Sequence, residues 1–168
     1  MSIDERRGFF LPNLYSPTPT DANSVKKLYG DIKEVWFPGV HSDVGGGYER
    51  REQALAQVAL QWMLREASWK PDGLRLDASK QSRVLGEKYP PPDPASDQHW
   101  SLTPAWWPLE IIPQVSGRQG QDHRWHKTLV VNLFRRRNIP EGATLHSSVD
   151  QRREARPDWK PRLPKVYK

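Results

Sequence analysis

The residues best suited to chemistry lie in one short stretch, residues 34–48. An apolar run ends in a Pro-Gly pair, His41 and Asp43 follow it, and three glycines come next. An imidazole in such a turn can take the proton of a serine hydroxyl when a buried acid orients the ring. We therefore treat His41 as a candidate general base.

The neighbours of this histidine suggest supporting roles in the turn. Asp43 is too close in sequence to be the usual orienting acid, so we interpret it as a loop-bracing or helix-capping group. Gly45, Gly46 and Gly47 could allow close backbone approach and positive φ angles, and Tyr48 could pack on the loop. Two alternatives stay open: a purely structural histidine, and a metal-binding His-x-Asp pair. A second cluster of ligands is not evident, so we expect no metal and no cofactor.

A strand and a helix would position the turn. The sequence predicts a strand over residues 34–38, bounded by the Pro-Gly pair. Apolar residues at three- and four-residue spacing predict a helix over 49–68 that packs on a sheet. We expect residues 1–33 to be mostly loop, 86–98 to be an extended linker, 126–139 to form one or two strands, and 157–168 to be an extended tail.

The second half of the chain adds aromatic and basic candidates. Trp100, Trp106 and Trp107 could form a patch at a lipid interface, although we favour packing in a loop-rich core. His99 and His146 could form a secondary site, although we favour structural hydrogen bonds for both. The run 135–137 consists of three arginines that could pair with phosphates, and we favour a solvated strand end.

Composition limits the class of protein. The 168 residues include 16 Pro and 8 Trp, only 36% are hydrophobic, and the mean hydropathy is -0.84. These values favour an irregular, loop-rich globular piece rather than a simple disordered chain. The net charge is +6, and its whole excess lies in residues 71–168, where 17 basic residues face 11 acidic ones. A basic surface can attract anionic partners.

Some kinds of site and segment are not expected from this sequence. It contains no Cys, which excludes a disulfide, a zinc-thiolate site and a cysteine nucleophile. No apolar run approaches the length of a membrane span. The first residues also lack the apolar core of a signal peptide.

Taken together, the motifs resemble a known family. The stretch Trp36-Phe-Pro-Gly-Val-His41-Ser-Asp43-Val-Gly-Gly-Gly-Tyr48 resembles the signature of the uncharacterised α/β-hydrolase domain family that includes the type VI secretion phospholipase effectors (Tle-type lipases). Weaker similarities to the same family lie, in order, at residues 4–7, 99–110, 137–142 and 146–153. The resemblance implies an ester hydrolase with a Ser-Asp-His triad, in which His41 is the base.

The rest of that triad is not found in the sequence. The family's serine lies in a Gly-x-Ser-x-Gly elbow and its acid in a Trp-Asp-Thr-Val-like stretch, both upstream of the histidine, and neither motif occurs in these residues. We therefore expect residues 1–168 to be the C-terminal part of one α/β-hydrolase domain. This part would have an incomplete parallel sheet with flanking helices and long Pro- and Trp-rich loops. Residues 1–85 would hold the His turn and helix, and 86–168 the basic region.

The expected function follows from this resemblance. The chain would belong to a bacterial lipase or phospholipase acting on lipid esters, inactive without the serine, which an upstream half or a partner chain would supply. It would lie in the cytoplasm, with export by a type VI secretion system and contact with a membrane surface as further possibilities. The alternative is a non-catalytic accessory module whose basic surface binds anionic lipid, nucleic acid or a partner protein, of which nucleic acid is the least expected.

Overall fold

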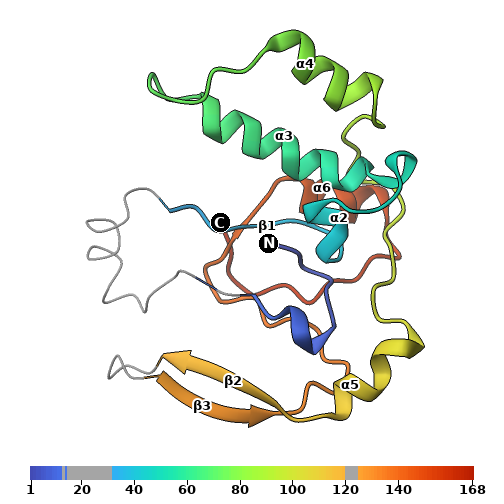
Figure 1. Cartoon of the computed structure of the whole chain (residues 1–168), viewed down its shortest axis with the longest axis vertical. Helices are drawn as coiled ribbons and strands as arrows, with labels where there is room; N and C mark the ends of the chain where they lie inside the picture. The colour runs from blue at the N-terminus through green and yellow to red at the C-terminus, as the bar shows by residue number, and fades with distance from the viewer. Residues whose placement is uncertain (13, 15–31, 120–124) are drawn as a thin grey trace.

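A short parallel sheet runs through the middle of the molecule (Figure 1). The structure is a computed structural model that describes residues 1–12, 14, 32–119 and 125–168. Strand β1 (Val35–Trp36) pairs in parallel with β4 (Thr144–Leu145). Along its other edge, the Phe37 amide donates to the Met1 carbonyl at 2.7 Å. Segments from the beginning, the first third and the end of the sequence therefore share one sheet.

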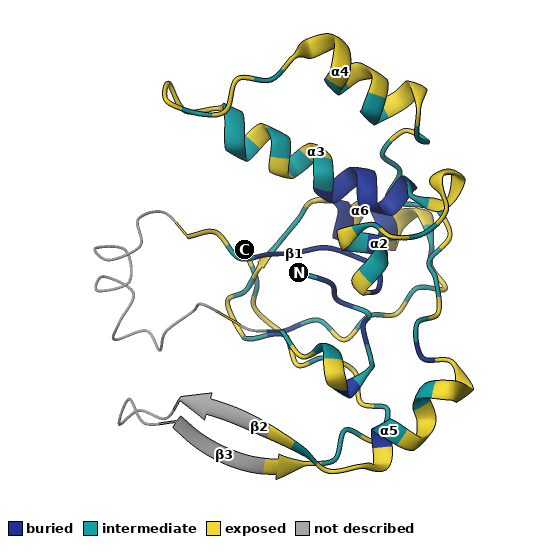
Figure 2. Ribbon diagram, viewed as in Figure 1, coloured by how far each residue is buried: buried dark blue, intermediate teal, exposed yellow. Residues whose placement is uncertain are grey.

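The two faces of β1 are both covered, because neighbouring side chains of a strand point to opposite faces. Trp36 points to one face and is packed with Ile3, Ile139 and Val149. Val35 and Phe37 lie in a second cluster with residues of the helix α3 (Ala54–Ser68). Figure 2 shows that burial is concentrated on the strand and on the first half of α3. Parallel strands buried on both faces are typical of α/β proteins, whereas the full hydrolase fold stays a prediction.

Helix α3 is confirmed as the main helix, but it is shorter than predicted. Residues Arg50–Glu52 form a separate 3-10 turn before it. After α3, the chain forms a small helix, α4 (Ala78–Ser82), which Asp77 caps by accepting the Lys80 amide at 3.1 Å. One π-helical turn, Arg83–Glu87, follows. The expected extended linker is therefore wrong for its first two residues, 86 and 87.

A hairpin lies at the opposite end of the molecule from α4 (Figure 1). Its strands, β2 (Gln114–Gln119) and β3 (Trp125–Val130), are antiparallel. The chain reaches it through a 3-10 turn, Pro104–Trp106, and the helix α5 (Trp107–Ile111). The prediction of a strand in 126–139 is confirmed for β3 only, and residues 131–139 form no strand. Its partner β2 contains one apolar residue, so no alternating pattern marked it as a strand.

The last part of the chain covers the Trp36 face of the sheet. The helix α6 (Ser148–Ala155) contributes Val149 to the core, and Trp159 and Leu163 of the tail pack against it. Residues 157–168 form neither helix nor strand, as predicted. Among the helices of the described residues, none is long and apolar enough to cross a membrane.

Candidate active site around His41

His41 is the first residue of the short helix α2 (His41–Gly45), which begins shortly after β1 ends. It therefore lies on a helix rather than on the expected loop. Its backbone amide donates to Glu5 Oε2 at 3.2 Å, and its side chain is exposed. The ring contacts Phe10, with 4.9 Å between the ring centroids. Within the described part of the chain, no side-chain or backbone group forms a hydrogen bond with the imidazole.

The turn between β1 and α2 depends on Gly39. Its φ angle is +107°, and a Cβ atom at this position would lie 2.6 Å from the Cβ of Asp43. Its amide donates to Asp4 Oδ2 at 2.8 Å. This glycine was not among the predicted supporting residues, although the Pro-Gly pair before His41 is the signal that could have indicated it.

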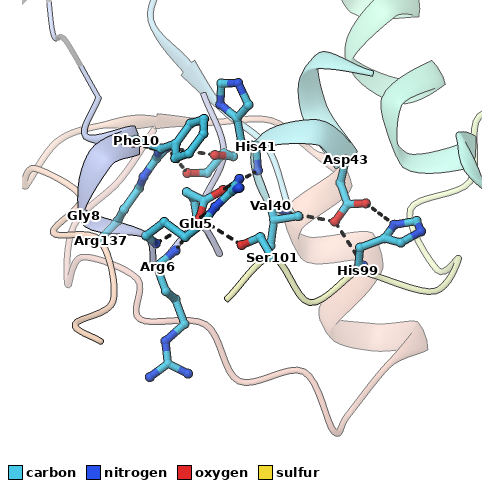
Figure 3. Close-up of polar contacts among 12 residues, drawn as sticks. Glu5, Arg6, Gly8, Phe10, Val40, His41, Asp43, His99, Ser101 and Arg137 are labelled. Carbon is cyan, nitrogen blue, oxygen red and sulfur yellow. Dashed lines mark hydrogen bonds and ion pairs between the residues drawn. The ribbon is translucent and has the colours of Figure 1, made fainter. Parts of the chain in front are cut away.

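Asp43 points away from His41 and toward His99 (Figure 3). Its buried carboxylate accepts the Val40 amide at 3.0 Å, which caps α2, and the His99 amide at 3.3 Å. The second oxygen lies 2.7 Å from Nδ1 of His99. These are contacts of a bracing and capping group, and they tie the segment around residue 99 to the His41 helix.

Three side chains contact the His99 ring. Tyr48 stacks on it, with 3.5 Å between ring centroids and 15° between ring planes. The Nε2 atom of His99 lies 3.4 Å from Glu52 Oε2. Burial, followed by the negative charge of Asp43, raises the pKa of Tyr48. The predicted packing role of Tyr48 is thus directed at His99, which itself forms structural hydrogen bonds.

The glycine run divides into two kinds of position. Gly46 and Gly47 have φ angles of +81° and +127°, which other residues rarely adopt. Gly45 lies inside α2 without a positive φ, and a Cβ atom there would meet nothing within 4 Å. The expected backbone requirement is therefore wrong for Gly45.

Glu5 connects the N-terminal segment to the His41 helix. Its buried carboxylate accepts the amides of Arg6 and Arg7, each at 3.0 Å, and the hydroxyl of Ser101 at 2.9 Å (Figure 3). The Arg7 guanidinium also donates to both of its oxygens. Burial acts to raise the pKa of Glu5, but the bonds from Arg7, Ser101 and His41 outweigh it and lower the pKa to about 2.

The pKa of the neighbouring residue Asp4 shifts in the opposite direction. Its carboxylate accepts the Gly39 amide and, at 3.2 Å, the indole of Trp159. Burial dominates over these bonds and raises the pKa of Asp4 to about 6. The role of Asp4 could not be predicted from local spacing, because its contacts are to residues more than thirty positions away.

An aromatic wall stands beside His41. Phe10, which touches the His41 ring, also meets Trp106 edge-on, with 5.8 Å between centroids. The Arg7 guanidinium lies 3.9 Å above the Phe10 ring. Trp106 is half-buried, whereas Trp100 and Trp107 are exposed. Core packing, the favoured interpretation of these tryptophans, therefore fails for Trp100 and Trp107.

A groove of about 650 Å³ lies beside α2, between β1 and α3. Most of its walls are apolar side chains, including those of Val35, Phe37, Val44, Trp62 and Met63. Val44 belongs to the helix that begins at His41, so the groove and the histidine share one element.

Two other predicted groups have structural positions. His146 stacks on Phe37, with 4.6 Å between centroids, and its Nδ1 lies 2.9 Å from Ser148 Oγ. Burial lowers the pKa of His146. Arg137 donates to the carbonyls of Ser2, at 2.8 Å, and Phe10, and burial lowers its pKa to about 10. It is therefore not a solvated strand end.

Among the described residues, no group of three or more His, Cys, Asp or Glu side chains could hold a metal ion. His41 and Asp43, the pair considered for a metal, point in different directions in Figure 3.

Comparisons with known proteins concern the first part of the chain most directly. Residues 1–66 match the family described as the catalytic domain of the Tle1-like phospholipase effectors of type VI secretion systems. This range includes β1, α2 with His41, and most of α3. The match indicates a lipase-like function for this part.

A curated relative covers more of the sequence. The chain is 26% identical over 203 aligned positions to the uncharacterized protein YEL023C of Saccharomyces cerevisiae. The alignment covers 78% of this chain but only 30% of the yeast protein. No solved structure matches the chain.

Proposed function

We propose that this chain forms part of a serine hydrolase that cleaves lipid esters, with His41 as the general base. One observation carries the proposal. An exposed imidazole, held by its backbone and unpaired at its ring among the described residues, follows β1 within the range that matches a phospholipase catalytic domain.

In this reaction His41 takes the proton of a serine hydroxyl as the serine attacks the ester carbonyl, and returns it to the leaving alcohol. The serine and the acid that orients the ring come from residues other than these 168, because neither a Gly-x-Ser-x-Gly nor a Trp-Asp-Thr-Val-like stretch occurs among them. The Glu5 bond to the His41 amide supports this role, since it fixes the start of α2 without occupying the ring.

His99 is the competing candidate for the base, because Asp43 faces its Nδ1 as an orienting acid would. Two contacts argue against it. Its Nε2 already faces the Glu52 carboxylate, and Tyr48 covers its ring. A base must have a nitrogen free to reach the hydroxyl proton, so we assign the Asp43–His99 pair a structural role.

The groove beside α2 supports a lipid substrate. An acyl chain needs an apolar surface close to the reacting ester, and pockets of this size commonly hold small apolar ligands. The groove shares α2 with His41 and has apolar walls.

The test compares two histidine variants in the gene product that includes its flanking coding sequence. Phospholipid hydrolysis is measured for the wild type, His41→Ala and the matched control His99→Gln. We expect His41→Ala to reduce turnover by about 10³-fold or more, and His99→Gln to keep most of it. The reverse order would transfer the role of base to His99 and overturn the assignment.

A further inference from the structure

A second pocket, of about 380 Å³, lies beside the N-terminal segment. Asp4 and Arg6 line it, whereas Glu5, between them, contacts the His41 helix. Six cationic side chains and only three acidic ones line the pocket. The cations are Arg6, Arg136, Arg152, Arg156, Lys160 and Arg162.

The most informative of these cations is Arg152 of α6. Its residue surface is only 2% exposed, and its Nη1 donates to the carbonyls of Pro94 at 2.5 Å and Ser96 at 2.8 Å. Its buried Nε has no hydrogen-bond partner. A buried donor without a partner costs free energy, and a guanidinium is well suited to bind the oxygens of a phosphate or a carboxylate.

Some of the other cations already have hydrogen-bond or ion-pair partners, and two have none among the described residues. Arg6 donates to the Phe134 carbonyl, and Arg136 donates to the Lys160 carbonyl. The side chains of Lys160 and Arg162 are exposed and form no bond or ion pair within the described part of the chain. The pocket thus combines one buried cation with two cations that are free to meet a ligand.

The three acidic side chains do not neutralise this set. Asp97 and Asp158 both pair with Arg156, at 3.0 and 3.5 Å. Asp4 accepts the Gly39 amide and the Trp159 indole, and its charge interacts with those of Arg152 and Arg136, but among the described residues it forms no ion pair with either within 4.0 Å. The indole of Trp159 lies 5.4 Å from the Arg152 guanidinium and forms an aromatic part of the wall.

We propose that this pocket binds a phosphate group, carried either by a phospholipid headgroup or by a small soluble phosphate ester. Arg152 is the buried cation of the site, and Lys160 and Arg162 are the cations that close on the ligand. This binding does not depend on hydrolysis at His41.

The test measures binding by the whole chain to two kinds of probe. Calorimetric titrations use inorganic phosphate and glycerol 3-phosphate, and co-sedimentation uses phosphatidylcholine vesicles with and without phosphatidylglycerol. The variants are Lys160→Ala/Arg162→Ala, Arg152→Gln and, as control, Arg153→Ala, whose exposed side chain lies outside the pocket and pairs with Asp150 at 3.4 Å.

We expect the double variant to weaken binding by about tenfold or more, and Arg153→Ala to leave it unchanged. A loss seen only with anionic vesicles assigns the site to a lipid headgroup, and a loss seen with the soluble phosphates assigns it to a free ester. If the wild type binds neither probe, or if Arg153→Ala weakens binding as much as the double variant, the proposal is wrong. Arg152→Gln adds to the test where circular dichroism shows it folded, and the double variant decides where it is not.

His41→Ala separates this proposal from the proposed hydrolysis. The variant should bind phosphate like the wild type while losing turnover. Loss of phosphate binding in His41→Ala would contradict the independence of the two sites.

Discussion

At His41 the backbone, rather than the side chain, carries the anchoring contacts. The amide is held by Glu5, the preceding turn by Asp4, and the helix start by Asp43. All three are acids, and each accepts a backbone amide of the segment 39–41. The ring is thereby placed without being occupied, which is what a base awaiting its serine requires.

Gly39 should be the least replaceable glycine of the turn. We expect Gly39→Ala to lower the free energy of unfolding by about 3 kcal/mol, because the new Cβ meets Asp43 and φ is positive. Gly45→Ala is the matched control, with open space around it and an ordinary φ, and it should cost nothing. Urea unfolding of both variants measures the difference. Equal effects would mean that the turn does not have this geometry.

Sequence reasoning at the residue scale indicated which residues to inspect but not how they contact each other. His41, Asp43 and Tyr48 stand out because a dense local motif surrounds them. The partners of Glu5 and His99 in the site could not be predicted, since they lie at sequence separations of 36 and 56 residues. Such contacts depend on the tertiary fold, which local spacing does not encode.

At the scale of elements, β1 owes its position to packing on both faces. A strand of two residues has few ladder bonds, so side-chain burial must hold it. Trp36 and Phe37 belong to separate core clusters on the two sides of the sheet. The His41 turn is carried directly by this strand, so its stability depends on both clusters.

We expect Phe37→Ala to cost about 3–5 kcal/mol of unfolding free energy, as for other buried aromatic residues. Phe9→Ala is the control, because Phe9 is 54% exposed and should change stability little. Thermal unfolding of the two variants gives the comparison. Similar melting temperatures would contradict the packing of α3 on β1.

Some helices could be predicted from the spacing of their apolar residues and others could not. Helix α3 was predicted because its apolar residues recur at helical spacing over four turns. Helix α6 was not, since it reads Ser-Val-Asp-Gln-Arg-Arg-Glu-Ala, in which Val149 is the one large apolar residue. A short helix whose buried residues are one serine, one valine and one arginine has no periodic apolar pattern to detect.

At the scale of the whole molecule, two neighbouring acids give stability opposite dependences on pH. Glu5 has a folded pKa of about 2, below its ordinary value of 4.5, so the unfolded chain binds the proton more tightly. Stability due to Glu5 therefore rises between pH 2 and 4.5. Asp4 has a folded pKa of about 6, above its ordinary 3.8, so its contribution falls as the pH rises between these values.

Two isosteric variants separate these contributions in urea unfolding from pH 2 to 7. Glu5→Gln should remove a rise of about 3 kcal/mol below pH 4.5. Asp4→Asn should remove the fall between pH 4 and 6. Each variant serves as the control for the other. Parallel profiles for the wild type and Glu5→Gln would show that the Glu5 bonds do not form.

Contacts between distant parts of the chain could not be predicted from the sequence. Parallel pairing was expected from the family resemblance, and the structure pairs β1 with β4, which lies more than a hundred residues away. The basic excess of residues 71–168 was visible in the sequence, but its concentration around Arg152 was not. The residues of that pocket come from five separate stretches of the chain.

The most direct measurement is the rate of phospholipid hydrolysis by the gene product with its flanking coding sequence, as wild type, His41→Ala and His99→Gln. The account predicts turnover by the wild type, a loss of about 10³-fold or more in His41→Ala, and near wild-type turnover in His99→Gln. Absence of hydrolysis by the wild type, or retained turnover in His41→Ala, would contradict the assignment of His41 as the base of a lipid esterase.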